Sequence, residues 1–242
     1  MNLKELKRNW DQFGEIDPLW AIVTAKDKKE NKWDEKEFFA TGKLLMEQTI
    51  KEARQINPSL KFSKALDFGC GVGRLTLPMS DYFVEVVGVD IAPSMIRLAE
   101  KYKTKENCKF ILNDKPDLRI FNDESFDFIV SFITLQHMAP RYSKKYIKEF
   151  ARILKPGGMM VFNLPSGLIV YPKKKGIKEF FSVNYIKRIL GFYRSKKPTM
   201  EMYYINEDEI IRLLEKSRIK VIKSTNLVLG NFIFQKYRGI KI

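Results

Sequence analysis

The chain has 242 residues, 45% of them hydrophobic, and a formal net charge of +15 at pH 7. This length and apolar content suffice for one domain with a sizeable core. No apolar run approaches the ~18 residues of a membrane-spanning helix, and the first residues lack the apolar stretch of a secretion signal. The two cysteines, Cys70 and Cys108, form no framework for disulfides or zinc, so we expect a cytoplasmic protein without a metal site.

The N-terminal part of the chain predicts helices. Residues 1–33 are rich in aromatic side chains, and Pro18 argues against one continuous helix there. Asp34 predicts the start of a helix that runs to about Ile56, because aspartate is a favoured cap residue and two glutamates occupy the first turn.

Strand and helix patterns alternate from Lys64 onward, which predicts a parallel α/β sheet. The expected elements are strands near 64–68, 84–90, 109–113, 126–132 and 158–163, and helices near 72–80, 93–103 and 142–154. A helix from about 206 to 217 and two strands, 219–226 and 229–237, follow at the end of the sequence.

A glycine-rich turn follows the first predicted strand. The strand contains Asp67, and the turn has glycines at alternate positions, Gly69, Gly71 and Gly73. Such a turn bends the chain sharply and lets a ligand lie directly on the backbone, next to unpaired N–H groups. An ordinary tight connection between strand and helix is the simpler alternative. The spacing lacks the third glycine of the dinucleotide fingerprint, because Arg74 stands there.

Two acidic side chains near consecutive strand ends favour an amino-acid nucleoside over NAD. Asp67 next to the turn would repel a pyrophosphate but attract an ammonium group. Asp90 ends the second strand, at the distance where an acid reaches ribose hydroxyls in such folds. Asp90 also fits a cap for the helix expected from about Ala92, and both roles are compatible.

Five segments together resemble the motifs of the class I S-adenosylmethionine (SAM) methyltransferases, in the family's order from residue 64 to about 164. They are 66–73, 87–95, 110–114, 125–132 and 149–158. The resemblance implies a Rossmann-like three-layer sandwich with a seven-stranded, mostly parallel sheet and an antiparallel C-terminal hairpin strand.

The resemblance also implies a domain organisation. The whole chain, 1–242, would be a single methyltransferase domain. Its parts would be a helical extension that covers the cofactor (1–60), a SAM-binding core (64–164), a basic aromatic lid (165–205), and a C-terminal helix with a β-hairpin (206–242).

By resemblance, SAM is the cofactor and S-adenosylhomocysteine (SAH) the product. Asp67 would hold the methionine amino group and Asp90 the ribose, while the glycines would contact the methionine part. Met95 would help to cover the adenine, although its helical spacing equally fits the core, and Asn113 or Asp114 would receive the adenine amino edge. The implied cofactor-binding residues are Asp67, Gly69, Cys70, Gly71, Gly73, Asp90, Ile91, Met95, Asn113, Asp114 and Ser131.

The loop after the fourth strand, 131–138, would face the reacting methyl group. It contains neither the Asn/Asp/Ser-Pro-Pro-aromatic tetrad of nucleic-acid amino-methyltransferases nor a cysteine nucleophile. It does contain His137, the only histidine of the chain. A pKa near ~6.5 suits removal of a proton from a hydroxyl or amine, so His137 is the catalytic candidate. A structural imidazole beside the cofactor is the alternative.

Positive charge is concentrated in residues 171–197, where nine Lys or Arg stand against one acid, Glu179. The segment fits a substrate lid, an interfacial helix on anionic lipid, or a solvated positive face over buried aromatics. We expect methyl transfer to oxygen or nitrogen of a small molecule, with a sugar or lipid-linked glycan among the candidates. RNA methylation through this basic segment is the alternative, and a protein that binds SAM without chemistry is a third.

Overall fold

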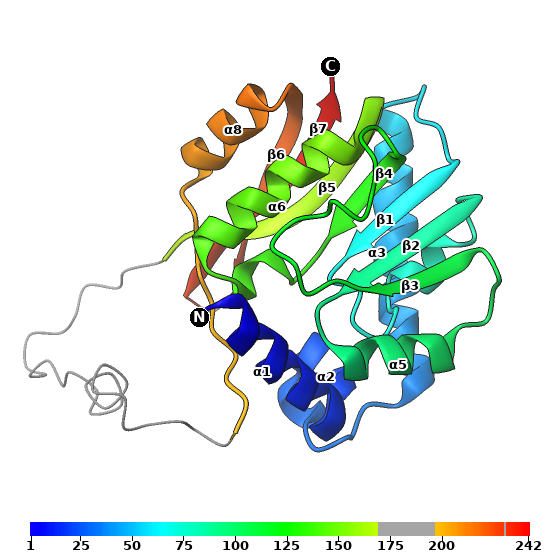
Figure 1. Cartoon of the computed structure of the whole chain (residues 1–242), viewed down its shortest axis with the longest axis vertical. Helices are drawn as coiled ribbons and strands as arrows, with labels where there is room; N and C mark the ends of the chain where they lie inside the picture. Colours follow the sequence, from blue (N-terminus) through cyan, green and yellow to red (C-terminus); the bar gives the residue numbers. More distant parts are fainter. Residues whose placement is uncertain (169–196, 230) are drawn as a thin grey trace, which may run out of the picture.

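The computed structural model describes residues 1–168, 197–229 and 231–242, and these contain a seven-stranded sheet in the order β3-β2-β1-β4-β5-β7-β6 (Figure 1). Neighbours among β1 to β5 run parallel, and β7 runs antiparallel to both β5 and β6. The predicted fold is therefore confirmed. The strands are β1 (Lys64–Phe68), β2 (Glu85–Asp90), β3 (Cys108–Leu112), β4 (Phe126–Ser131), β5 (Leu154–Leu168), β6 (Ile219–Leu229) and β7 (Phe232–Lys241).

Helices cover both faces of the sheet, so the architecture has three layers. Apolar residues of α3, α4 and α5 join the core on one face, and those of α6 and α8 join the core on the other. The helices are α1 (Leu3–Ile16), α2 (Pro18–Ile22), α3 (Glu35–Ile56), α4 (Thr76–Met79), α5 (Pro93–Tyr102), α6 (Pro140–Ile153) and α8 (Glu207–Lys216), with short 3-10 turns η1 (Lys26–Lys28) and η2 (Leu135–His137). Within the described ranges, none of the helices combines the length and apolarity needed to cross a bilayer.

The N-terminal helices follow their sequence signals. Asp34 accepts a hydrogen bond from the Glu37 N–H and caps α3, as predicted. Pro18 occupies the first turn of α2 and separates it from α1, which confirms the predicted break. The α1 and α2 helices lie across the carboxyl ends of the parallel strands (Figure 1).

Two predicted elements differ in length. The helix expected over 72–80 is only the four-residue α4, because Gly71 and Gly73 hold left-handed φ angles of 53° and 88° that a helix cannot continue. The fifth strand is longer than predicted, since β5 continues past residue 163 by pairing with β7. Its register shifts between Pro165 and Gly167, where proline cannot donate to the ladder.

The predicted lid, residues 165–205, falls largely outside the described residues. The basic segment 171–197, on which the predictions of lipid or RNA contact rest, also lies outside the described residues except for residue 197.

Helix α3 packs tightly on the glycine turn at Gly42. A Cβ atom there would lie 2.1 Å from the carbonyl oxygen of Arg74. Only glycine therefore lets the helix approach this backbone.

We predict that Gly42→Ala lowers the free energy of unfolding by about 1–3 kcal/mol, because overpacking outweighs the better helix propensity of alanine. Lys43→Ala, at an exposed neighbouring position of the same helix, should change it by less than about 0.5 kcal/mol. Urea denaturation measures both. A stabilised Gly42→Ala variant would contradict the packing described here.

Candidate functional site

The glycine turn presents bare backbone at the carboxyl end of β1. Gly69 and Gly71 have φ angles of 77° and 53°, in the left-handed region that favours glycine. A Cβ at Gly69 would lie 2.1 Å from the Thr134 side chain, and one at Gly71 would lie 2.6 Å from the Ile22 side chain. Neither position therefore has room for a side chain.

Asp90 links this turn to the end of β2. Its Oδ2 accepts a hydrogen bond from the Gly71 N–H at 2.9 Å, and its Oδ1 accepts one from the Ala92 N–H at 2.9 Å. Burial raises the pKa of the Asp90 carboxyl. Each oxygen retains a further lone pair, so the carboxylate can receive hydroxyl groups of a ligand as well.

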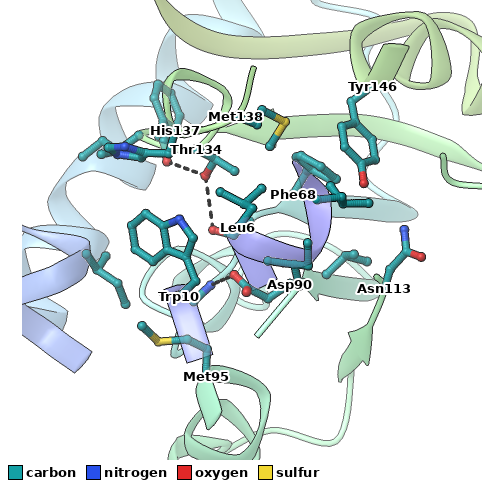
Figure 2. A pocket seen from close by; sticks show the side chains of 18 residues that line it. Leu6, Trp10, Phe68, Asp90, Met95, Asn113, Thr134, His137, Met138 and Tyr146 are labelled. Atoms are coloured by element: carbon teal, nitrogen blue, oxygen red, sulfur yellow. Dashed lines mark hydrogen bonds between the residues drawn. The ribbon is translucent and has the colours of Figure 1, made fainter. Parts of the chain in front are cut away.

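A cavity lies above the turn, at the point where the strand order reverses between β1 and β4 (Figure 2). It encloses about 700 Å³ of empty space, part of it open to solvent. Seven of the predicted site residues line it: Gly69, Gly71, Asp90, Ile91, Met95, Asn113 and His137.

The other five predicted residues do not line this cavity. The Asp67 carboxylate is buried and accepts a hydrogen bond from the Thr76 hydroxyl at 2.7 Å. Ser131 donates to the Phe68 carbonyl, and Asp114 pairs with Lys7 of α1 at 3.0 Å. The remaining two, Cys70 and Gly73, belong to the turn itself. Asn113 rather than Asp114 thus lies at the cavity, and the ligand contacts of these five residues remain predictions.

The N-terminal extension forms one wall of the cavity. Leu3, Leu6 and Trp10 of α1 line it, as Figure 2 shows for Leu6 and Trp10. Two hydrogen bonds of 2.8 Å, from the Ser94 N–H and hydroxyl to Asp11, fasten α1 to α5. The three- and four-residue spacing of Leu3, Leu6 and Trp10 is the sequence signal of a buried helix face.

Thr134 of the loop after β4 also lines the cavity, and the sequence carried no comparable signal for it.

His137 lies in η2 and is 3% exposed. Its Nδ1 is 2.8 Å from the carbonyl oxygen of Glu201. A carbonyl can only accept, so Nδ1 carries the proton and Nε2 carries the lone pair. The Trp10 ring packs edge-on against the imidazole at 5.1 Å. Burial lowers the pKa of His137 to about 4, so the ring is neutral at neutral pH.

A second, larger cavity adjoins the first, and we call it the outer chamber. It encloses about 1780 Å³, including open solvent, between α2, α3, residues 200–202 and the strands β5, β6 and β7. Ile22, Phe132, Ile133 and His137 line both cavities and form what we call the shared wall. In the described part of the chain, no cluster of three or more His, Cys, Asp or Glu side chains is arranged to hold a metal ion.

The buried Asp67 carboxyl makes stability depend on pH. Burial raises its pKa from 3.8 to about 6, although the Thr76 hydrogen bond and the nearby Arg74 oppose the shift. Because the folded-state pKa is raised, the stability that the protonated Asp67 carboxyl contributes is fully present below about pH 4. This contribution is lost as the pH rises through about 6.

We therefore predict that Asp67→Asn raises the free energy of unfolding of the ligand-free protein by roughly 1–3 kcal/mol at pH 8, and by much less at pH 4. The asparagine still accepts the hydrogen bond from Thr76. Asp27→Asn, at an exposed position, should have little effect at either pH. An equal gain for Asp67→Asn at both values would mean that the carboxyl titrates normally.

Part of the chain is similar to known methyltransferases. Residues 66–162 match the family model described as a methyltransferase domain. Demethylmenaquinone methyltransferase of Staphylococcus aureus (strain JH9) is 38% identical over 105 residues, which cover 42% of each protein. The enzyme of the same name from Staphylococcus carnosus is 34% identical over 143 residues, 57% of each protein. The chain thus spans about half the length of the curated relatives it matches.

Solved structures share the fold. A SAM-dependent methyltransferase from Methanosarcina mazei is 26% identical with a TM-score of 0.56, covering 78% of this chain and 97% of that one. Magnesium protoporphyrin IX methyltransferase of Synechocystis PCC 6803, crystallised with SAH, aligns over 99% of both chains with a TM-score of 0.65 at 14% identity. We conclude that residues 66–162 match a methyltransferase domain and that the structure around them has the fold of SAM-dependent methyltransferases.

Proposed function

We propose that this chain transfers the methyl group of SAM to an oxygen or nitrogen atom of a small molecule. The observation that carries the proposal is the shared wall. One cavity lies over the glycine turn and Asp90, the second is largely apolar, and His137 lines both. A donor in the first cavity and an acceptor in the second would therefore meet at this wall.

The residues present fit SAM. Asp90 offers lone pairs to the ribose hydroxyls, and Gly69 and Gly71 offer bare backbone to the methionine part. Met95 and Asn113 line the cavity near Asp90, where the adenine would lie (Figure 2). When bound, SAM supplies an electrophilic methyl group. The chain itself would bind and orient SAM and the acceptor and exclude water from between them. Alignment of these two reactants would account for much of the rate.

His137 is the proposed proton acceptor. The Glu201 carbonyl fixes its tautomer, so the unprotonated Nε2 is the atom that can take a proton. The names of the Staphylococcus relatives support a small-molecule acceptor, and the described residues give no support to a nucleic-acid substrate. The largely apolar outer chamber also makes a plain sugar a poor fit.

We predict that Asp90→Asn weakens SAM binding by about 10-fold or more, because a charged hydrogen-bond acceptor to the ribose is lost. Isothermal titration calorimetry with SAM, SAH and NAD measures this. Asp27→Asn is the control for charge alone and should bind SAM as the unmodified protein does. Tight binding of NAD without SAM or SAH would refute the proposed function.

We further predict that His137→Ala lowers methyl transfer about 100-fold or more, while the affinity for SAM changes less than about 3-fold. The assay uses methyl-labelled SAM and fractionated cell extract, followed by identification of the labelled product. The unmodified protein should lose activity only as the pH falls toward about 4, because protonation of the imidazole removes the lone pair. Unchanged turnover in the variant would assign His137 a structural role.

A further inference from the structure

We propose that the outer chamber binds an apolar methyl acceptor that reacts through a hydroxyl oxygen rather than an amine nitrogen, and that the side-chain amide of Asn163 holds this oxygen. The inference rests on the proposed function and names its substrate class. Three observations support it: an apolar strip along the chamber, the N–H donors of Asn163, and the hydrogen bond that ties Asn163 to the shared wall.

The apolar strip lies on β6 and β7. Phe232 and Phe234 occupy alternate positions of β7 and therefore face the same side of the sheet. Leu227 of β6 stands opposite Phe234 in the antiparallel register, and all three side chains line the chamber. Leu227 is 58% exposed, so apolar surface remains open to water here. A hydrophobic body would cover this surface, and a plain sugar would not.

Asn163 of β5 presents hydrogen-bond donors to the chamber. Its Oδ1 lies 2.8 Å from the Ile133 backbone nitrogen, which can only donate, so the amide orientation is fixed with oxygen toward Ile133. Its Nδ2 donates no hydrogen bond to the residues that the structure describes. Asn163 is half-buried and lines the chamber, so this donor group can bind a lone pair of a ligand.

The same amide stabilises the shared wall. Ile133 has a φ angle of 57°, a left-handed conformation that a β-branched residue rarely adopts. Backbone strain of this kind occurs preferentially at functional sites. The hydrogen bond from the Ile133 N–H to Asn163 offsets part of the strain and keeps Ile133 between the two cavities. Asn163 thus stands where the acceptor would meet the methyl donor.

The number of lone pairs on the reacting atom separates oxygen from nitrogen. A hydroxyl oxygen has two, so one can accept a hydrogen bond from Asn163 while the other attacks the methyl carbon. A neutral amine nitrogen has one, and a hydrogen bond from Asn163 would occupy the pair that must attack. A donor at this position therefore favours a hydroxyl as the reacting group.

The transfer balances without another reactant. A lone pair of the hydroxyl oxygen attacks the methyl carbon and a C–O bond forms. The C–S bond breaks, and its electron pair passes to sulfur, which gives SAH. The hydroxyl proton passes to Nε2 of His137, so the products are a methyl ether, SAH and a protonated imidazole.

Three probes with the same apolar body test the substrate class. In the presence of saturating SAH, 4-butylphenol should bind at least 10-fold more tightly than 4-butylaniline or butylbenzene, because its oxygen is the one good acceptor for the Asn163 amide. Calorimetry measures the affinity of 4-butylphenol, and its displacement measures the other two. With methyl-labelled SAM, the label should be recovered as 4-butylanisole.

Asn163→Asp is the decisive variant, because its carboxylate still accepts the hydrogen bond from Ile133 but has no N–H to donate. Methyl transfer to 4-butylphenol should fall at least 10-fold, while the affinity for SAH changes less than about 3-fold. Asn226→Asp adds the same charge at an exposed position of β6 outside the chamber lining and should leave both quantities unchanged.

The inference is overturned if 4-butylphenol binds no more tightly than the other two probes, or if it is not methylated. Label on the nitrogen of 4-butylaniline, or unchanged transfer in Asn163→Asp, would equally overturn it. In all these cases SAH still binds. Failure of the unmodified protein to bind SAM or SAH would instead reject the proposed function.

Discussion

The hydrogen bond between the Asp90 carboxylate and the Gly71 N–H holds the site together. It joins the turn after β1 to the end of β2, and the second carboxylate oxygen accepts from Ala92 at the start of α5. Burial of this carboxylate is costly, as its raised pKa indicates, and the two backbone donors offset part of that cost. The floor of the cavity therefore depends on one side chain that also faces the ligand space.

The loop after β4 is built around the bare backbone of the turn. Gly69 leaves room for Thr134, whose side chain lies where a Cβ would stand, and Ile133 takes a left-handed conformation beside it. A hydrogen bond from the Ile133 N–H to Asn163 secures this shape. The residues of this loop thus belong to the shared wall, with one cavity on each side. An acceptor and a methyl donor on either side would be aligned by packing against this wall, where His137 would take the proton.

Much of this could be predicted from the sequence, because the signals are local. The alternating strand and helix patterns, the cap at Asp34 and the glycine turn each depend on neighbouring residues, and the parallel sheet follows from their order. The length of α4 could not be predicted from apolar spacing, since the left-handed glycines override it. The hydrogen bond of the Asp67 carboxyl to Thr76 could not be predicted, because side-chain direction at a strand end depends on the sheet, and the contact of Asp67 with the ligand stays a prediction. The outer chamber combines α2, α3 and the antiparallel strands, which lie far apart in the sequence, and no local pattern marks Asn163.

A crystal structure with bound SAH tests the central claim most directly. The account predicts that the ribose hydroxyls bind the Asp90 carboxylate, that the methionine part lies over Gly69 and Gly71, and that the sulfur faces the shared wall at His137. A nucleoside bound elsewhere, with Asp90 free of contact or with its sulfur directed away from the outer chamber, would contradict the account.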